Sequence, residues 1–112
     1  MYQQSMQLCV DVYGVCKTFP SHERIALANQ LERAAVSISS NISEGSSRSS
    51  DLDFAHFLEI SLGSAFEIET QLTVAFKLQY IDSKTYDNLR TQIEVIQKGL
   101  GRFIGILRKQ SI

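Results

Sequence analysis

The chain has 112 residues and a formal net charge of −1 at pH 7, with 44% hydrophobic and 21% charged residues. This length suits one domain, and the composition excludes a disordered chain because enough apolar side chains are present to form a core. The balanced charge, with a pI near 6.1, does not predict bulk attraction to nucleic acid or to an anionic membrane.

Signals for membrane insertion, export and metal binding are missing from the sequence. No apolar run reaches the ~18–20 residues that span a bilayer, and the first residues do not read as a secretory signal, so we expect a cytoplasmic protein without membrane association. Helical spacing would separate the Cα atoms of Cys9 and Cys16 by ~10 Å, too far for a disulfide, so both are expected to be free thiols. His22 and His56 stand alone, and we expect no metal and no cofactor.

The first predicted helix runs from about Tyr2 to Thr18. One apolar stripe follows helical spacing and is formed by Tyr2, Met6, Cys9, Tyr13 and Cys16. A neighbouring stripe is formed by Leu8, Val12, Val15 and Phe19. Pro20 should stop this helix because the residue before a proline avoids the α region, and Ser21 is positioned to cap the next helix.

The second predicted helix runs from about His22 to Glu44. Its apolar face consists of Leu27, Leu31, Ala34, Ile38 and Ile42, widened by Ala28 and Ala35. Gly45 is expected to end the helix as a left-handed C-cap. The serine-rich stretch 37–50 is therefore predicted to be mostly helical, with a loop only over about 45–49.

The third predicted helix runs from about Ser50, as N-cap, to Gln79. Asp51 and Asp53 lie in its first turn, where carboxylates suit the helix dipole. Its wide apolar arc contains Phe54, Leu58, Leu62, Ala65, Ile68, Leu72 and Phe76, with Phe57 and Phe66 at the margins. Such an arc indicates either that the helix is central in a bundle or that it also meets another subunit.

The fourth predicted helix runs from about Ser83 to Lys109, with Asp82 as its N-cap. Its coiled-coil-like seam consists of Tyr86, Leu89, Ile93, Ile96, Leu100, Phe103 and Leu107. Short connections between long helices predict an all-α, antiparallel up-down-up-down four-helix bundle that forms a single domain over residues 1–112.

Polar side chains form a stripe beside the apolar face of the second helix, at Gln30, Arg33, Ser37, Asn41 and Glu44. The third helix offers a matching row at His56, Glu59, Gly63, Glu67 and Thr70. Antiparallel pairing of the two helices would bring Arg33 level with Glu67, and Ser37 level with Gly63 and Ser64. We therefore predict a structural polar cluster that fixes the register of these helices, formed by Arg33, Ser37, Asn41, Glu44, Arg48 and Glu67.

A catalytic interpretation of the same residues would pair Glu44, Glu59 or Glu67 with His56 as acid and base. A di-metal bundle would need a Glu-x-x-His motif on each of two helices, and the sequence contains none. We therefore expect no enzymatic activity and no small-molecule substrate.

Two segments carry a family resemblance: "RAAVSISSNISEGSSRSS" and "FLEISLGSAFEIETQL". Together they resemble the 23S rRNA intervening-sequence protein family of bacterial four-helix-bundle proteins. The positions that match the family pattern are Gln30, Arg33, Ala34, Ser37, Ile38, Asn41, Ile42, Glu44, Gly45, Arg48, Gly63, Ser64 and Glu67. "FPSHE" also fits the segment before the second helix, whereas Ser43 stands where the family usually has Ala.

The resemblance implies a four-helix bundle, commonly assembled as a homopentamer, without enzymatic activity. It leads us to expect an oligomeric scaffold or interaction protein. The alternative is a nucleic-acid-binding accessory module that acts as a homopentamer and is associated with RNA or a reverse transcriptase, as a related accessory protein of diversity-generating retroelements is. If nucleic acid binds, the expected residues are Lys98, Arg102, Arg108 and Lys109, which lie near the end of the chain where no acid intervenes.

Overall fold

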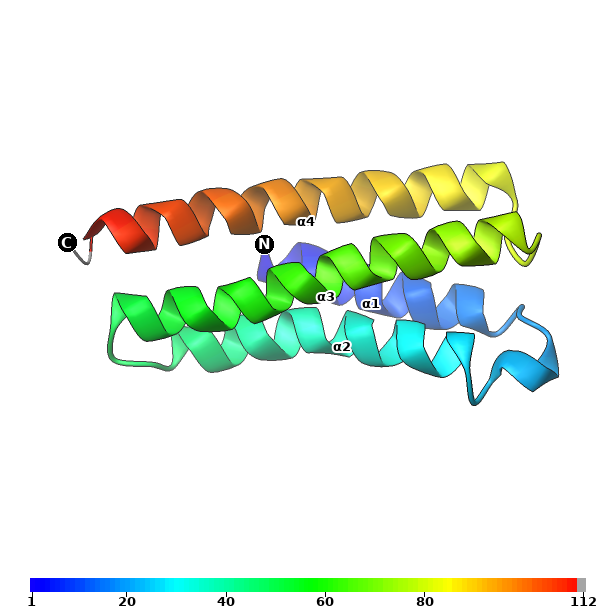
Figure 1. The fold of residues 1–112 in the computed structure, drawn as a ribbon, viewed down its shortest axis with the longest axis horizontal. Coiled ribbons are helices and arrows are strands. Elements are labelled where there is room, and N and C mark those ends of the chain that lie inside the picture. The colour runs from blue at the N-terminus through cyan, green and yellow to red at the C-terminus, as the bar shows by residue number, and fades with distance from the viewer. Residues whose placement is uncertain (111–112) are drawn as a thin grey trace.

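Four helices pack side by side in a computed structural model that describes residues 1–110. In chain order they are α1 (Tyr2–Cys16), α2 (Leu27–Ser46), α3 (Asp51–Lys77) and α4 (Ser83–Gln110), with a short 3-10 turn, η1 (Ser21–Glu23), before α2. Successive helices run in opposite directions along an elongated body with extents of 48 × 23 × 19 Å (Figure 1). The predicted all-α, up-down-up-down bundle is confirmed.

The helices form a ring in which each contacts two others. α2 packs on α3, α3 on α4 and α1 on α2, and the looser contact between α1 and α4 closes the ring. α3 has the most extensive contacts of the four helices, with both α2 and α4, and this placement accounts for most of its wide apolar arc. α1 is much shorter than α3 and α4. The side chain of Met1 lies near Gly99, so the rest of α4, from Leu100 to Gln110, extends past the start of α1.

The core consists of the predicted apolar faces. The largest fully buried side chains are Leu8, Val12, Leu31, Ile38, Leu58, Ile68, Leu72, Ile93, Ile96 and Leu100. Burying each such side chain contributes on the order of 1.5–3 kcal/mol. Of the two stripes on α1, the one containing Leu8 and Val12 enters this core. The other leaves Tyr2, Met6 and Tyr13 exposed on the surface.

Two N-caps are placed where the sequence predicts them. Ser50 Oγ accepts a hydrogen bond from Asp53 N over 3.1 Å, and Asp82 Oδ1 accepts from Thr85 N over 2.8 Å. These bonds satisfy backbone donors that the first turn of a helix leaves without partners. The hydrogen bonds from Thr85 also lower the pKa of Asp82, because they favour its charged form.

The start of α2 differs from the prediction. Ser21 begins the 3-10 turn and makes no capping bond, and α2 starts only at Leu27 after the non-helical residue Ala26. Glu23 supplies the acceptor instead, since its Oε1 takes a hydrogen bond from Leu27 N over 3.4 Å. Tyr80 donates to the other Glu23 oxygen over 2.8 Å, which ties this turn to the loop between α3 and α4.

Gly45 does not act as the predicted left-handed cap. It lies inside α2, which continues to Ser46, and no glycine of the described chain has a positive φ. Its role is close packing, because a Cβ at this position would lie 2.8 Å from both Phe54 Cδ1 and Phe57 Cβ. The left-handed residue of the bundle is instead Gln79, with φ of 65°, and the bond from Tyr80 N to Ala75 O closes a Schellman-type end on α3.

Candidate functional site

The polar stripes of α2 and α3 meet as their register predicts. Ser64 Oγ donates to Ser37 Oγ over 2.8 Å, and Asn41 Nδ2 donates to the same hydroxyl over 3.0 Å. Asn41 also reaches the backbone oxygen of Ser37 over 2.8 Å, so it bonds one turn back along α2 and does not bridge the following loop. Small side chains at this level allow the two helices to approach closely.

Arg33 and Glu67, which the predicted register places level with each other, do not form an ion pair in the described structure. Both side chains are exposed. They lie on the rim of a 430 Å³ cleft between α2 and α3, whose lining is completed by Gln30, Ala34, Ser37 and Ser64. Glu67 Oε1 accepts instead from Gln71 Nε2, one turn along α3, over 3.3 Å. Register alone therefore placed the two charged residues in one cleft without bringing them into contact.

The end of the stripe forms a small cluster around Arg48. Its guanidinium pairs with Glu44, four residues earlier, and lies over the ring of Phe57 at 4.7 Å from the centroid. Both charged side chains are largely exposed, so the pair contributes at most about 1 kcal/mol to stability. Glu44 and Arg48 both belong to the predicted polar cluster, whereas the aromatic partner of Arg48 depends on the turn between α2 and α3.

A buried hydrogen bond between α2 and α3 was not predicted from the sequence. Ser61, which is fully buried, donates from Oγ to the backbone oxygen of Ile38 over 2.8 Å. Ser61 precedes Ser64 by one turn on the same side of α3. The sequence signal that could have predicted this bond is the position of Ser61. It is a polar residue three positions before Ser64, on a face of otherwise apolar or small residues.

A second network joins α3 to α4. The rings of Phe76 and Tyr86 stack with centroids 4.5 Å apart, and Tyr86 Oη is 2.8 Å from Thr73 Oγ1. Arg90 reaches Tyr86 Oη over 3.2 Å and Glu69 over 3.6 Å. The hydrogen bond with Thr73, followed by that with Arg90, lowers the pKa of Tyr86. These contacts hold the C-terminal part of α3 and the N-terminal part of α4 together.

The basic residues near the C-terminus divide into two groups. Lys98, Arg102 and Lys109 follow one another at helical spacing on one exposed side of α4. Arg108 lies on another side and pairs with Glu59 of α3. The four residues predicted to bind nucleic acid therefore form a stripe of three basic side chains, whereas the fourth, Arg108, is paired with Glu59.

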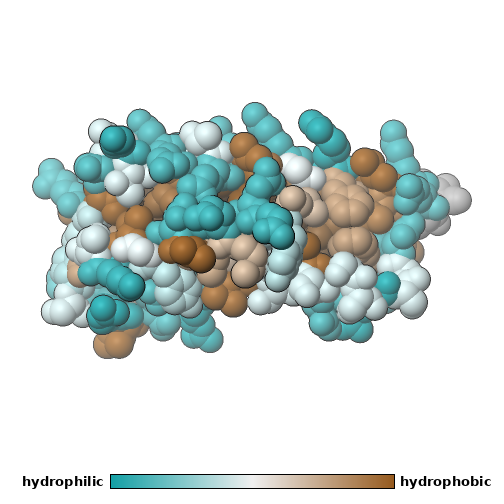
Figure 2. Space-filling model, turned by 180° about the vertical axis from the view of Figure 1, so that it is seen from behind, coloured by the Kyte–Doolittle hydropathy of each residue, from teal (hydrophilic) through white to brown (hydrophobic). Residues whose placement is uncertain are grey.

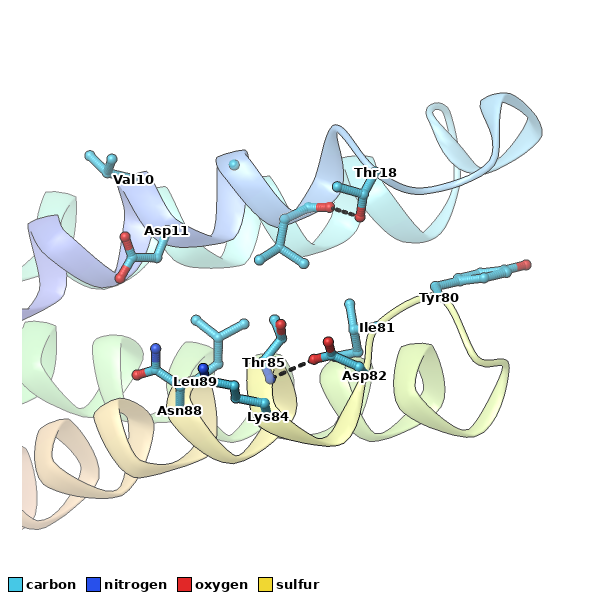
Figure 3. Close-up of a pocket in the computed structure, with 12 residues that line it drawn as sticks. Val10, Asp11, Thr18, Tyr80, Ile81, Asp82, Lys84, Thr85, Asn88 and Leu89 are labelled. Atoms are coloured by element: carbon cyan, nitrogen blue, oxygen red, sulfur yellow. Dashed lines mark hydrogen bonds between the residues drawn. The ribbon is translucent and has the colours of Figure 1, made fainter.

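A groove follows the loose contact between α1 and the start of α4 (Figure 3). It encloses about 740 Å³, and Val10, Ile81 and Leu89 are among its apolar lining residues. Asp11, Asp82, Lys84 and Asn88 supply polar groups at its edge, as the close-up shows. The sequence did not indicate this groove, because it depends on how far α1 stands from α4.

Apolar side chains are also exposed across α1 and the adjacent part of α2. Tyr2, Met6 and Tyr13 of α1 and Val36 of α2 are each 40–43% exposed. We call these four residues the α1 face. A 480 Å³ groove runs along this face. Its α1 side is lined by Tyr2, Met6 and Cys9, and its α2 side by Val36, Ser39, Ser40, Ser43 and Glu44. Because the side chains are large on α1 and small on α2, this surface is uneven, with protruding apolar side chains next to a groove.

The uncovered end of α4 exposes further apolar surface. In Figure 2, which views the molecule from behind, brown and tan atoms gather toward the end that carries the C-terminus. Beyond Gly99, Phe103 is only partly buried and Ile106 is 46% exposed, while Phe54 of α3 packs edge-on against Phe103 at 5.2 Å. α1 does not reach far enough to cover these side chains.

The remaining chemistry-bearing groups are two thiols and two histidines. Cys9 and Cys16 are free, as expected from their spacing, and burial raises the pKa of the Cys16 thiol to about 12. Within the part of the chain that the structure describes, no group of three or more His, Cys, Asp or Glu side chains could hold a metal ion. None of the helices in residues 1–110 is both long and apolar enough to cross a membrane.

Comparisons with known proteins agree with the fold and with the sequence motif. Residues 1–102 match the family model of the 23S rRNA-intervening sequence protein. A protein of unknown function from the S23 ribosomal protein family of Bacteroides thetaiotaomicron has a similar crystal structure, with a TM-score of 0.86 and 26% sequence identity. The similarity covers 92% of this chain and 96% of that chain. No curated protein matches this chain. These comparisons indicate no enzymatic family.

Proposed function

Because the chain belongs to the 23S rRNA-intervening sequence protein family, and because it carries an exposed apolar face, we propose that it is a non-enzymatic, oligomeric scaffold or interaction protein. In this proposal residues 1–112 act as one cytoplasmic domain that assembles with copies of itself, most simply as the pentamer that the family resemblance implies. The α1 face is the observation that carries the proposal.

The α1 face has the properties of a surface that is covered by another subunit. Tyr2, Met6 and Tyr13 lie on one side of α1 at spacings of four and seven residues, so they form a continuous ridge. Aromatic and methionine side chains are enriched in the cores of protein interfaces, whereas contiguous apolar patches are rare on monomers. The groove between this ridge and the small serine side chains of α2 provides space into which large side chains of a second copy can pack.

Light scattering coupled to gel filtration tests the assembly at micromolar concentration. We expect a species near five times the 12.6 kDa mass of one chain, and a 12.6 kDa species would overturn the proposal. The variant Met6→Glu with Tyr13→Glu should dissociate the assembly, because it places charges inside an apolar contact. Gln3→Glu, on an exposed polar position of the same helix, is the matched control and should leave the mass unchanged.

RNA binding is a second candidate function, favoured by the exposed stripe of Lys98, Arg102 and Lys109. Three cations along one side of a helix can contact successive phosphates, and a ring of five copies would repeat the stripe five times. The stripe lies on α4, away from the α1 face, so assembly does not require that it be covered. The family description refers to 23S rRNA, and RNA is therefore the probe of choice.

A gel-shift titration with a single-stranded RNA at several salt concentrations tests this second function. The logarithm of affinity should fall linearly with that of salt, and the slope should shrink by about 0.7 for each phosphate contact removed. Replacing Lys98, Arg102 and Lys109 by Gln should abolish the shift. Arg108→Gln, which removes a residue paired with Glu59, should have the smaller effect. If no gel shift appears even at low salt, RNA binding is excluded and the scaffold function is the one that remains.

A further inference from the structure

The cleft between α2 and α3 has the volume of a small-molecule site and a polar lining. It encloses about 430 Å³ and is lined by Gln30, Arg33, Ala34 and Ser37 of α2 with Ser64 and Glu67 of α3. Ligand pockets of proteins fall in a range of about 300–1,000 Å³. Five of these six residues are polar, so recognition in this cleft would depend on hydrogen bonds and charge.

The hydroxyl of Ser37 has one hydrogen left to donate. Its oxygen already accepts from Ser64 Oγ over 2.8 Å and from Asn41 Nδ2 over 3.0 Å. A hydroxyl has two acceptor lone pairs and one proton, so these two bonds occupy both lone pairs. The proton of Ser37 forms none of the hydrogen bonds found within residues 1–110, and Ser37 lines the cleft. The interhelical hydrogen bond thus turns Ser37 into a donor.

Arg33 and Gln30 add donors on the same wall. Gln30, Arg33 and Ser37 follow one another at spacings of three and four residues, which places them on one side of α2. The guanidinium of Arg33 forms no salt bridge within residues 1–110, and its planar fork of donors matches an oxyanion. A carboxylate or phosphate in the cleft would be contacted by Arg33, Ser37 and the Gln30 amide together.

The opposite wall offers acceptors. Glu67 uses Oε1 to accept from Gln71 Nε2, which leaves its second oxygen open to a donor. Gln71 itself is buried and does not line the cleft, so Glu67 supplies the acceptor on this wall. This wall therefore suits an amino or amide N–H.

We propose that the cleft binds a small molecule that carries both an oxyanion and an amino or amide group. The oxyanion would contact Arg33 and Ser37, and the N–H group would contact Glu67. Such a ligand bridges the two charges that the fold leaves apart, whereas a plain anion would meet the repulsion of the Glu67 carboxylate. The oxyanion can be a carboxylate, as in an α-amino acid, or a phosphate, as in a nucleotide whose base carries an amino group.

Backbone chemical shifts in NMR titrations distinguish these two sources. One titration uses L-glutamate and L-glutamine, a second uses GMP and AMP, and acetate and inorganic phosphate serve as plain anions. We expect saturable shifts of the amides of Gln30, Ser37 and Ser64 with the amino acids or with the nucleotides at millimolar concentration. Arg33→Gln and Glu67→Gln should each weaken binding at least about tenfold. Arg102→Gln, an exposed arginine on α4, is the matched control and should bind normally.

Several results would overturn the proposal. It is wrong if none of the four probes shifts the cleft amides saturably, or if Arg33→Gln binds as well as the unchanged protein. Binding of acetate or inorganic phosphate as strong as that of the probes would show that Glu67 has no role in recognition. Thermal unfolding of each variant, recorded on the same samples, shows whether a loss of binding reflects unfolding, and Arg33 and Glu67 are exposed enough to be replaced without disturbing the core.

Discussion

Gly45 lies against the ring of Phe54 so closely that a Cβ on Gly45 would be 2.8 Å from Phe54 Cδ1. The same Cβ would lie 2.8 Å from Phe57 Cβ, an atom fixed close to the backbone of α3. The end of α2 and the start of α3 therefore touch at a point where only a hydrogen fits. This contact sets the distance between the two helices next to their connecting turn, and it explains a glycine inside a helix, where that residue is otherwise unfavourable.

Gly45→Ala should destabilise the protein. The new methyl group must displace Phe54 and the backbone around Phe57, and overpacking of this kind costs about 1–3 kcal/mol. Ala gains about 1 kcal/mol of helix propensity over Gly, so the net loss of stability should be up to about 2 kcal/mol. Gly63→Ala is the matched control in α3, because nothing lies within 4 Å of its added Cβ, and it should be neutral or stabilising. Urea denaturation of both variants measures the difference, and equal effects would contradict the packing argument.

Arg33→Ala should leave stability nearly unchanged. An exposed side chain without an ion pair contributes little, and we expect a change within about 0.5 kcal/mol. Glu67→Ala should cost about 1 kcal/mol, because Gln71 Nε2 loses its acceptor. In a double-mutant cycle the two changes should add to within about 0.5 kcal/mol. A coupling energy well above that value, measured by chemical denaturation, would show that the two side chains do interact in solution.

Ser61→Ala should be more harmful than its small size suggests. The variant removes a buried hydrogen bond that crosses from α3 to the backbone of α2, which is worth about 0.5–1.5 kcal/mol. Ser46→Ala is the control, since Ser46 is exposed and bonds only to a carbonyl one turn back in its own helix. Thermal melts should show a clear drop for Ser61→Ala and almost none for Ser46→Ala. Equal melting temperatures would mean that the bond to Ile38 has no net effect.

Local signals in this sequence predicted local structure well. The caps at Ser50 and Asp82 depend on neighbouring residues of the same segment, and both form as predicted. The level of Ser37 and Ser64 followed from helical spacing and from the antiparallel pairing of α2 and α3. The register of two paired helices determines which residues lie at the same level. Because serine side chains are short and have few conformations, two serines at one level are held within hydrogen-bonding distance.

Features that depend on three-dimensional detail were not predictable. A glycine near the end of a helical pattern looks like a C-cap, and only the rings on α3 show that Gly45 is needed for packing. Arg33 and Glu67 have long, flexible side chains, so a shared level did not ensure contact. The left-handed residue Gln79 carried no glycine signal at all. The cleft that we propose as a ligand site is lined by both residues, and the shared level alone did not indicate it.

The buried thiol of Cys16 provides a test of the fold that does not depend on any proposed function. Burial first, and then the charge of Glu32, raises its pKa to about 12, above the ordinary value of 9.0. Between these two values the unfolded chain loses the thiol proton and the folded chain keeps it. The folded state therefore binds more protons there, and stability from this group is complete below pH 9 and falls as the pH rises, by about 1.4 kcal/mol per pH unit. We expect urea denaturation from pH 8 to pH 11 to show a steeper alkaline loss of stability for the natural protein than for Cys16→Ala. Every other titratable group is common to the two proteins, so the difference between the two curves isolates Cys16. Parallel curves would mean that this thiol is accessible to water in the folded state.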